Sequence, residues 1–179
     1  MKDIKGCKSP LWQPKLWNNL NDLPILEKTN CFSYAFNFIE YREKRLQPGE
    51  IGSNRVTEYT CNKILLKLKK DYPEIRMSNK EEKFNDCSRY KIALFVDRTI
   101  DNEDYHFYRQ DVNGLWSHKP GTLDVSNKDA SKKIIKDPEQ ADRDYTKYDG
   151  VTDYDNHNYS DFCYYFSYPV KDGPIIRKV

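Results

Sequence analysis

A cysteine and two histidines are the residues of this sequence whose types could carry out chemistry. Only three histidines occur, His106, His118 and His157, and the first two lie in one predicted hairpin. Cys31 follows Asn30 at the expected start of a helix, where unpaired backbone N–H groups favour a thiolate. A nucleophilic cysteine also needs a nearby base and a group that orients the base. The sequence therefore predicts Cys31 as nucleophile, His106 as base and His118 as the orienting residue.

The register of the hairpin decides whether the two histidines can act together. If residues 112–114 form a three-residue loop, Tyr108 pairs with His118, and His106 becomes a diagonal neighbour of His118 at about 7–8 Å along the backbone. If the loop is only residues 113–114, the register shifts by one and the two histidines point to opposite faces. The three-residue loop further predicts that both histidines project toward the start of the helix that carries the cysteine.

Structural roles compete with catalysis at these positions. A free cysteine is usually buried and inert, so catalysis and packing are weighed equally for Cys31. Three other cysteines are expected to be structural: Cys61, Cys87 and Cys163. A zinc site of Cys31, His106 and His118 would lack a clear fourth ligand and closely spaced ligand pairs. His157 lies in a polar stretch and is expected to be exposed.

Residues in and after the hairpin could serve a substrate groove. Trp116 is expected either in the core or as a groove wall. Arg109 is expected to pair with an acid such as Asp111 or Asp142, and binding of a substrate carboxylate is the alternative. Arg143 is expected to hold the long loop that follows the hairpin.

The elements that must position these residues follow from the apolar pattern. We expect helices at about 30–46 and 56–71, and strands at about 90–97, 104–110, 115–119 and 162–170. Residues 1–28 are expected to form an irregular segment strapped across the core, in which Pro10, Pro14 and Pro24 prevent a helix. Residues 120–161 form a long polar loop region, and its acidic run at 144–155 is expected to be solvated. This order predicts an α+β fold in one domain, 1–179, with the buried first helix packed on a mostly antiparallel sheet.

Composition argues against several classes of protein. The 179 residues include 30 Lys+Arg and 28 Asp+Glu, a net charge of +2, which argues against nucleic-acid and polybasic membrane binding. Mean hydropathy is −0.94, and without a run of about 18 apolar residues we expect no membrane span. The first residues lack the apolar region of a secretory signal. Five scattered cysteines without a CxxC pair fit a reducing compartment, so we expect a cytoplasmic or virion location.

The segment TNCFSYAFN (29–37) resembles the region around the nucleophile of papain-like cysteine peptidases. In that family a cysteine opens a buried helix and is followed by alternating aromatic and small residues. The order of cysteine, histidine and a further polar residue is similar to the NlpC-type and CHAP branches, in some of which a histidine takes the place that His118 would match. The resemblance implies a papain-like fold, no cofactor, and a peptide or cell-wall-type substrate. The chain has no glutamine between Gln13 and Cys31, so Asn30 or a backbone N–H would have to hold the oxyanion.

The chain resembles more closely a group of proteins from bacteria and large DNA viruses that share the patterns NCYxYA and DYHWYRxDxNGxWSHKPG. The matching segments here are NCFSYA (30–35), YKIAL (90–94), DYHFYRQDVNGLWSHKPG (104–121), IKDPEQADR (135–143) and FCYYF (162–166). This group implies no particular activity. Two hypotheses follow: a thiol hydrolase, either peptidase or amidase, that uses Cys31, or a non-catalytic structural or virion protein that assembles with other proteins on the same scaffold.

Overall fold

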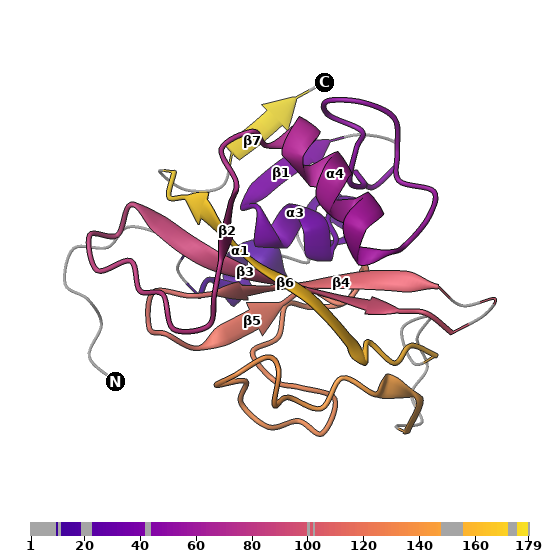
Figure 1. The fold of residues 1–179 in the computed structure, drawn as a ribbon, viewed down its shortest axis with the longest axis vertical. Helices are drawn as coiled ribbons and strands as arrows, with labels where there is room; N and C mark the ends of the chain where they lie inside the picture. Colours follow the sequence, from indigo (N-terminus) through magenta and orange to yellow (C-terminus); the bar gives the residue numbers. More distant parts are fainter. Residues whose placement is uncertain are drawn as a thin grey trace.

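The structure is built around an antiparallel sheet with helices on one face and irregular chain on the other (Figure 1). The computed structural model describes residues 10, 12–18, 23–41, 44–99, 101, 103–147, 156–171 and 175–178. Its helices are α1 (Pro14–Trp17), α2 (Leu23–Lys28), α3 (Cys31–Ala35) and α4 (Cys61–Asp71), with a 3-10 turn at Tyr145–Lys147. Its strands are β1 (Phe38–Tyr41), β2 (Arg76–Ser78), β3 (Arg89–Asp97), β4 (Asp104–Gln110), β5 (Trp116–His118), β6 (Asp161–Pro169) and β7 (Ile175–Lys178). The expected α+β class with a mostly antiparallel sheet is confirmed.

The sheet has the strand order β2-β6-β3-β4-β5, and every neighbouring pair is antiparallel. The central strand β3 is buried along nearly its whole length, as its continuous apolar run predicts. The strands expected at 90–97, 104–110, 115–119 and 162–170 are confirmed. β2 and β7 have no counterpart in the sequence prediction, and β7 pairs with β1 in parallel.

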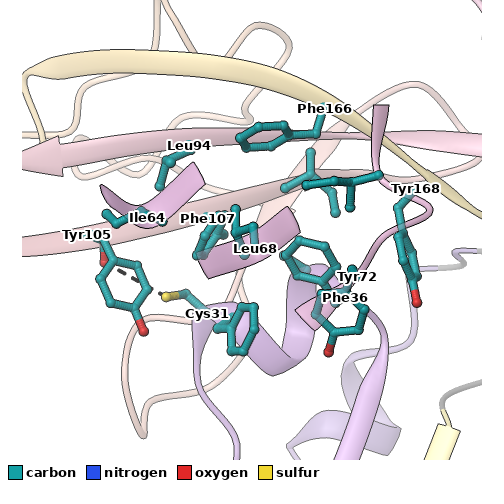
Figure 2. Packing of buried hydrophobic residues seen from close by; sticks show 14 of the residues in the cluster. Cys31, Phe36, Ile64, Leu68, Tyr72, Leu94, Tyr105, Phe107, Phe166 and Tyr168 are labelled. Carbon is teal, nitrogen blue, oxygen red and sulfur yellow. Dashed lines mark hydrogen bonds between the residues drawn. The ribbon is translucent and has the colours of Figure 1, made fainter. Parts of the chain in front are cut away.

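Helices α3 and α4 pack on one face of the sheet and form the main hydrophobic core with it (Figure 2). From α4, Ile64 and Leu68 are fully buried one turn apart, and most of the helix's lysines are exposed. Thr60 caps this helix by accepting a hydrogen bond from a backbone N–H of its first turn. The helix predicted at 56–71 is therefore confirmed, with a start that lies five residues later.

The opposite face of the sheet is covered by the long segment that follows β5. Its core consists of Ala93, Phe95, Tyr108, Trp116, Ile135, Tyr159 and Tyr165. The segment 120–147 has little regular structure, as expected, and lies on the other side of the sheet from α3 and α4 (Figure 1). Arg143 donates hydrogen bonds to the carbonyl oxygens of Pro138, Ala141 and Tyr159, which confirms that it holds this segment in place.

The first 28 residues contain two helices, although the prolines were expected to prevent any. Pro14 occupies the first position of α1, where a proline removes no intrahelical hydrogen bond, and Pro24 lies second in α2. Trp17 at the end of α1 is only 1% exposed and packs edge-on against Tyr34. The expectation that this segment straps across the core is therefore right for its described part, whereas the exclusion of helices is wrong.

The helix predicted at 30–46 is wrong beyond its first turn. α3 ends at Ala35, Asn37 adopts a left-handed backbone with φ 55°, and the chain then continues as strand β1. The guanidinium of Arg109 donates hydrogen bonds to the carbonyl of Tyr34 and to the side-chain oxygen of Asn37, so a buried ion satisfies the end of this helix. An apolar run of this kind is buried either as a helix or as a strand, and its periodicity does not distinguish the two.

Candidate functional site

The β4–β5 hairpin has the three-residue loop that places both histidines on one face. Tyr108 pairs with His118, and Gly114 in the loop has φ 80°, which glycine adopts without strain. Nε2 of His106 lies 2.8 Å from Nδ1 of His118, and both residues are 1% exposed. The predicted diagonal histidine pair is confirmed.

The hydrogen bonds of this pair fix the protonation of three ring nitrogens. Nε2 of His118 lies 3.0 Å from the carbonyl oxygen of Lys128, and because a carbonyl only accepts, this nitrogen carries the proton. Nδ1 of His118 then accepts a hydrogen bond from Nε2–H of His106. Burial lowers the pKa of His118 to about 4, and burial followed by the neighbouring His118 lowers the pKa of His106 well below 6.5. Both rings are neutral and bind the long segment to the sheet.

Asn30 has a structural role at the start of α3. Its side-chain oxygen accepts a hydrogen bond from the backbone N–H of Ser33, and the Ser33 hydroxyl accepts one from the backbone N–H of Asn30, which is a capping box. Its amide N–H₂ donates to the carbonyl oxygen of Leu46 at 2.9 Å. Asn30 is therefore the N-cap of α3, and its amide donor is bound to a backbone carbonyl instead of facing an oxyanion.

Cys31 is packed as a neutral thiol in the core. Its side chain is directed at the carbonyl oxygen of Tyr105, 3.9 Å from the sulfur (Figure 2), and the residue is 6% exposed. Burial, followed by the charge of Asp104, raises the pKa of this thiol to about 12. The N–H groups at the helix start favour a thiolate, but loss of solvation outweighs them.

Cys31 and the histidine pair pack on opposite faces of the sheet, although Cys31 and His106 border the same pocket. Tyr105 and Phe107 of β4 belong to the core cluster that contains Cys31, so the intervening His106 points to the other face. There the His106 ring packs against Tyr108 and Tyr159 at centroid distances of 4.9 and 5.1 Å. Among the described residues no hydrogen bond joins Cys31 to a histidine. The prediction that the histidines project toward the start of α3 is wrong.

A pocket of about 580 Å³ nevertheless lies beside the cysteine. Cys31 and His106 both border it, together with Arg45, Arg55 and Glu103 from other segments. No sequence pattern singles out the last three residues, because they lie in irregular segments that only the tertiary fold brings together. A pocket therefore lies where the sequence predicts a site, but its charged side chains that lack a partner among the described residues are not the predicted Cys31 and His106.

His157 lies at the same pocket and is not exposed as predicted. Its side chain is 15% exposed, and its ring nitrogens lie 3.5 Å from Asp97 and 3.7 Å from Asp104. Burial raises the pKa of Asp104, although the hydroxyl of Tyr159 donates a hydrogen bond to its carboxylate. Within the described residues, no group of three or more His, Cys, Asp or Glu side chains could hold a metal ion, which includes the alternative zinc site.

Arg109 belongs to a buried network and not to a groove. Its guanidinium lies 3.2 Å from the carboxylate of Asp111, donates to the Tyr34 hydroxyl at 2.9 Å and stacks on the Tyr34 ring at 3.9 Å. Burial raises the pKa of Asp111 although Arg109 opposes this. The expected pairing with an acid is confirmed. Trp116 is 4% exposed and borders a different, smaller hollow next to Tyr165, so neither residue contributes to the pocket at Cys31.

The cysteines form disulfides that the sequence interpretation missed. Cys61 in the first turn of α4 is bonded to Cys163 in β6, 102 residues away in the sequence. Cys87 is also disulfide-bonded, and Cys31 is a free thiol. The structural role expected for Cys61, Cys87 and Cys163 is correct, but the reduced state implied by a reducing compartment is wrong.

Comparisons with known proteins indicate a structural family. No family model and no solved structure matches the chain. The chain is 35% identical over 135 residues to Insoluble matrix shell protein 1 of Ruditapes philippinarum. The aligned region covers 75% of this chain and 82% of that protein. The chain belongs to the family of this shell protein.

Membership in the family of Insoluble matrix shell protein 1 corrects the functional prediction. A thiol hydrolase with Cys31 as nucleophile and His106 as base is contradicted, because the relative carries the name of a structural matrix protein. The assignment as a cysteine peptidase falls with it, and the buried neutral thiol agrees with this correction. The papain-like part of the fold stays a prediction, since no solved structure matches.

The expected location also changes. Neither a cytoplasmic nor a virion location finds support in a shell matrix relative. No helix among the described residues is long and apolar enough to cross a membrane, which agrees with the expectation of no membrane span.

Proposed function

We propose that this chain is a structural component of an insoluble protein matrix and works through its packed fold. The observation that carries the proposal is its 35% identity to Insoluble matrix shell protein 1 over most of both chains. Its partners in this role are other matrix proteins, in keeping with the alternative in which the scaffold assembles without catalysis.

The cross-links of the fold support this role. The Cys61–Cys163 disulfide ties α4 to β6, and disulfides persist in oxidising surroundings outside the cytosol. A unit that must hold its shape in a permanent assembly benefits from such links because they disfavour the unfolded chain.

The buried polar network supports the same role. The hydroxyl of Tyr34 accepts a hydrogen bond from Arg109 and donates one to Ser117, and the hydroxyl of Ser117 donates to Asp111. Each of these groups has a partner, so the network rigidifies the contact between α3 and the hairpin. None of its members is available to a substrate.

Sequential extraction of native material tests the proposal. Material from the organism that encodes the chain is extracted with aqueous buffer, then with denaturant, then with denaturant and reductant, and the chain is quantified in each fraction with an antibody. We expect most of it in the two denaturing fractions. Labelled, folded recombinant chain added at the first step is the control and should stay in the aqueous fraction. Recovery of the native chain mainly in the aqueous fraction would overturn the structural role.

A further inference from the structure

The pocket at Cys31 continues into a second hollow rich in basic side chains. The pocket of about 580 Å³ shares Arg45, Gln47 and Arg55 with this hollow of about 390 Å³, which Glu27, Lys28 and Lys44 also line. We call these joined hollows the basic groove. Its four cationic side chains come from the end of α2 and from the segment between β1 and α4, so only the folded chain brings them together.

The two arginines of the groove differ from four other arginines that the structure describes. Within the described residues, the guanidinium groups of Arg45 and Arg55 form no hydrogen bond or ion pair, and both side chains are exposed. By contrast, four others bind acids, hydroxyls or carbonyls: Arg89, Arg98, Arg109 and Arg143. Two unused guanidinium groups at the edge of a deep pocket are available to a ligand.

Two other polar side chains of the pocket are already engaged. The side-chain amide oxygen of Gln47 accepts a hydrogen bond from the hydroxyl of Tyr105, and the side chain of Asn30 caps α3 and donates to the carbonyl oxygen of Leu46. Glu103 also lines the pocket, is exposed and has no ion pair among the described residues. A ligand in the pocket therefore meets both free positive charge, from the two arginines, and free negative charge.

A buried lysine holds part of the pocket lining in place. Pro120, Gly121 and Leu123 line the pocket, and the buried ammonium of Lys119 donates hydrogen bonds to the carbonyl oxygens of Gly121 and Leu123 at 3.1 and 2.8 Å. It also donates to the carbonyl of Leu26 in α2 at 3.1 Å. The groove is therefore preformed, which lowers the entropic cost of binding.

We propose that the basic groove binds an acidic peptide segment, with carboxylates on Arg45 and Arg55 and backbone N–H or amine groups facing Glu103. The planar guanidinium matches a carboxylate with two parallel hydrogen bonds. A polymer that carries an anion on every unit would be repelled by Glu103 and Asp104, which line the same pocket, whereas a peptide also offers hydrogen-bond donors to these acids. An acidic peptide would thus be the kind of partner that the chain binds in the matrix, and this inference rests on the proposed structural role.

The test measures binding of a fluorescent aspartate-rich peptide to the purified, oxidised chain by anisotropy. We expect the double variant Arg45→Gln/Arg55→Gln to bind at least about tenfold more weakly, since two charge-assisted contacts are lost. Glu103→Gln should bind the peptide a few-fold more weakly, because it removes the negative charge that the N–H or amine groups of the peptide face. The matched control Lys132→Gln/Lys133→Gln removes the same charge from exposed residues outside the groove and should change binding less than about twofold.

The outcomes separate the proposal from unspecific attraction. Equal weakening by the arginine and lysine variants, or tighter binding of dextran sulfate than of a peptide of equal charge, would overturn it. A melting curve of each variant establishes that it is folded. The binding assay uses the isolated chain, so a negative result would overturn the proposed peptide site without affecting the extraction result. A negative extraction result would overturn the structural role without affecting a measured affinity for the peptide.

Discussion

Removing the Cys61–Cys163 disulfide should destabilise the chain strongly without unmaking the native packing. The bond connects residues 102 apart, and cross-linking a loop of about 100 residues lowers the free energy of folding by up to about 4.7 kcal/mol through the unfolded chain. Both cysteines are only partly buried at the edge of the core, so the double variant Cys61→Ala/Cys163→Ala loses little packing. We therefore expect a loss of about 3–5 kcal/mol in the free energy of unfolding.

The assay is thermal unfolding followed by circular dichroism, with and without reductant. For a chain of this size each kcal/mol moves Tm by about 2–4 °C, so the variant should melt about 6–20 °C below the wild type. Reductant should lower the Tm of the wild type more than that of the variant, which retains only the disulfide of Cys87. A variant that melts within about 2 °C of the wild type would refute the reasoning.

Three further perturbations test the packing around the site. Asp111→Asn leaves the buried charge of Arg109 without its counter-ion and should cost about 3–5 kcal/mol in chemical denaturation, and a loss below about 1 kcal/mol would contradict the pair's burial. The pKa of His118 is about 4 in the folded chain and 6.5 in the unfolded chain, so on acidification the unfolded state binds the proton first. The free energy of unfolding should therefore fall by about 3 kcal/mol between pH 6.5 and 4, and an unchanged Tm from pH 7 to 5 would count against this. Gly52→Ala would place a Cβ 2.3 Å from the Lys70 carbonyl oxygen, so we expect this variant to melt below the wild type. A melting temperature equal to that of the wild type would contradict this close approach.

The hairpin illustrates what a sequence can determine. Asn113-Gly114 and the alternating pattern around it predict the loop, the register and the shared face of His106 and His118, and the structure agrees. These are local properties, because turn chemistry and a strand's two-residue period act over a few residues. The buried strands β3 and β6 were predictable for the same reason.

The sequence does not predict how the elements that carry Cys31 and His106 pack against each other. The sequence places Cys31 at a helix start and His106 in a strand, and both placements are right. It does not determine on which face of the sheet the helix packs, and that choice sets the thiol against Tyr105 and the imidazole against Tyr159. A nucleophile and its base need contact, and among the described residues Cys31 forms no hydrogen bond with a histidine.

The missed disulfides have a similar origin. Five cysteines allow many pairings, and spacing alone does not choose among them. The partner of Cys61 lies 102 residues away on a strand that packs under α4, so only the tertiary fold brings the pair together. The early turn out of α3 likewise depends on Arg109, a residue more than 70 positions later.

The central claim is that the chain works through its packed fold and not through chemistry at Cys31. The rate at which iodoacetamide alkylates Cys31 in the folded chain at pH 7, compared with the same cysteine in denaturant, tests it most directly. A thiol pKa raised from 9.0 to about 12 lowers the thiolate fraction about a thousand-fold, and burial slows the reagent further, so labelling of the folded chain should be at least about a thousand times slower. Labelling as fast as in the unfolded chain, or faster, would contradict the account.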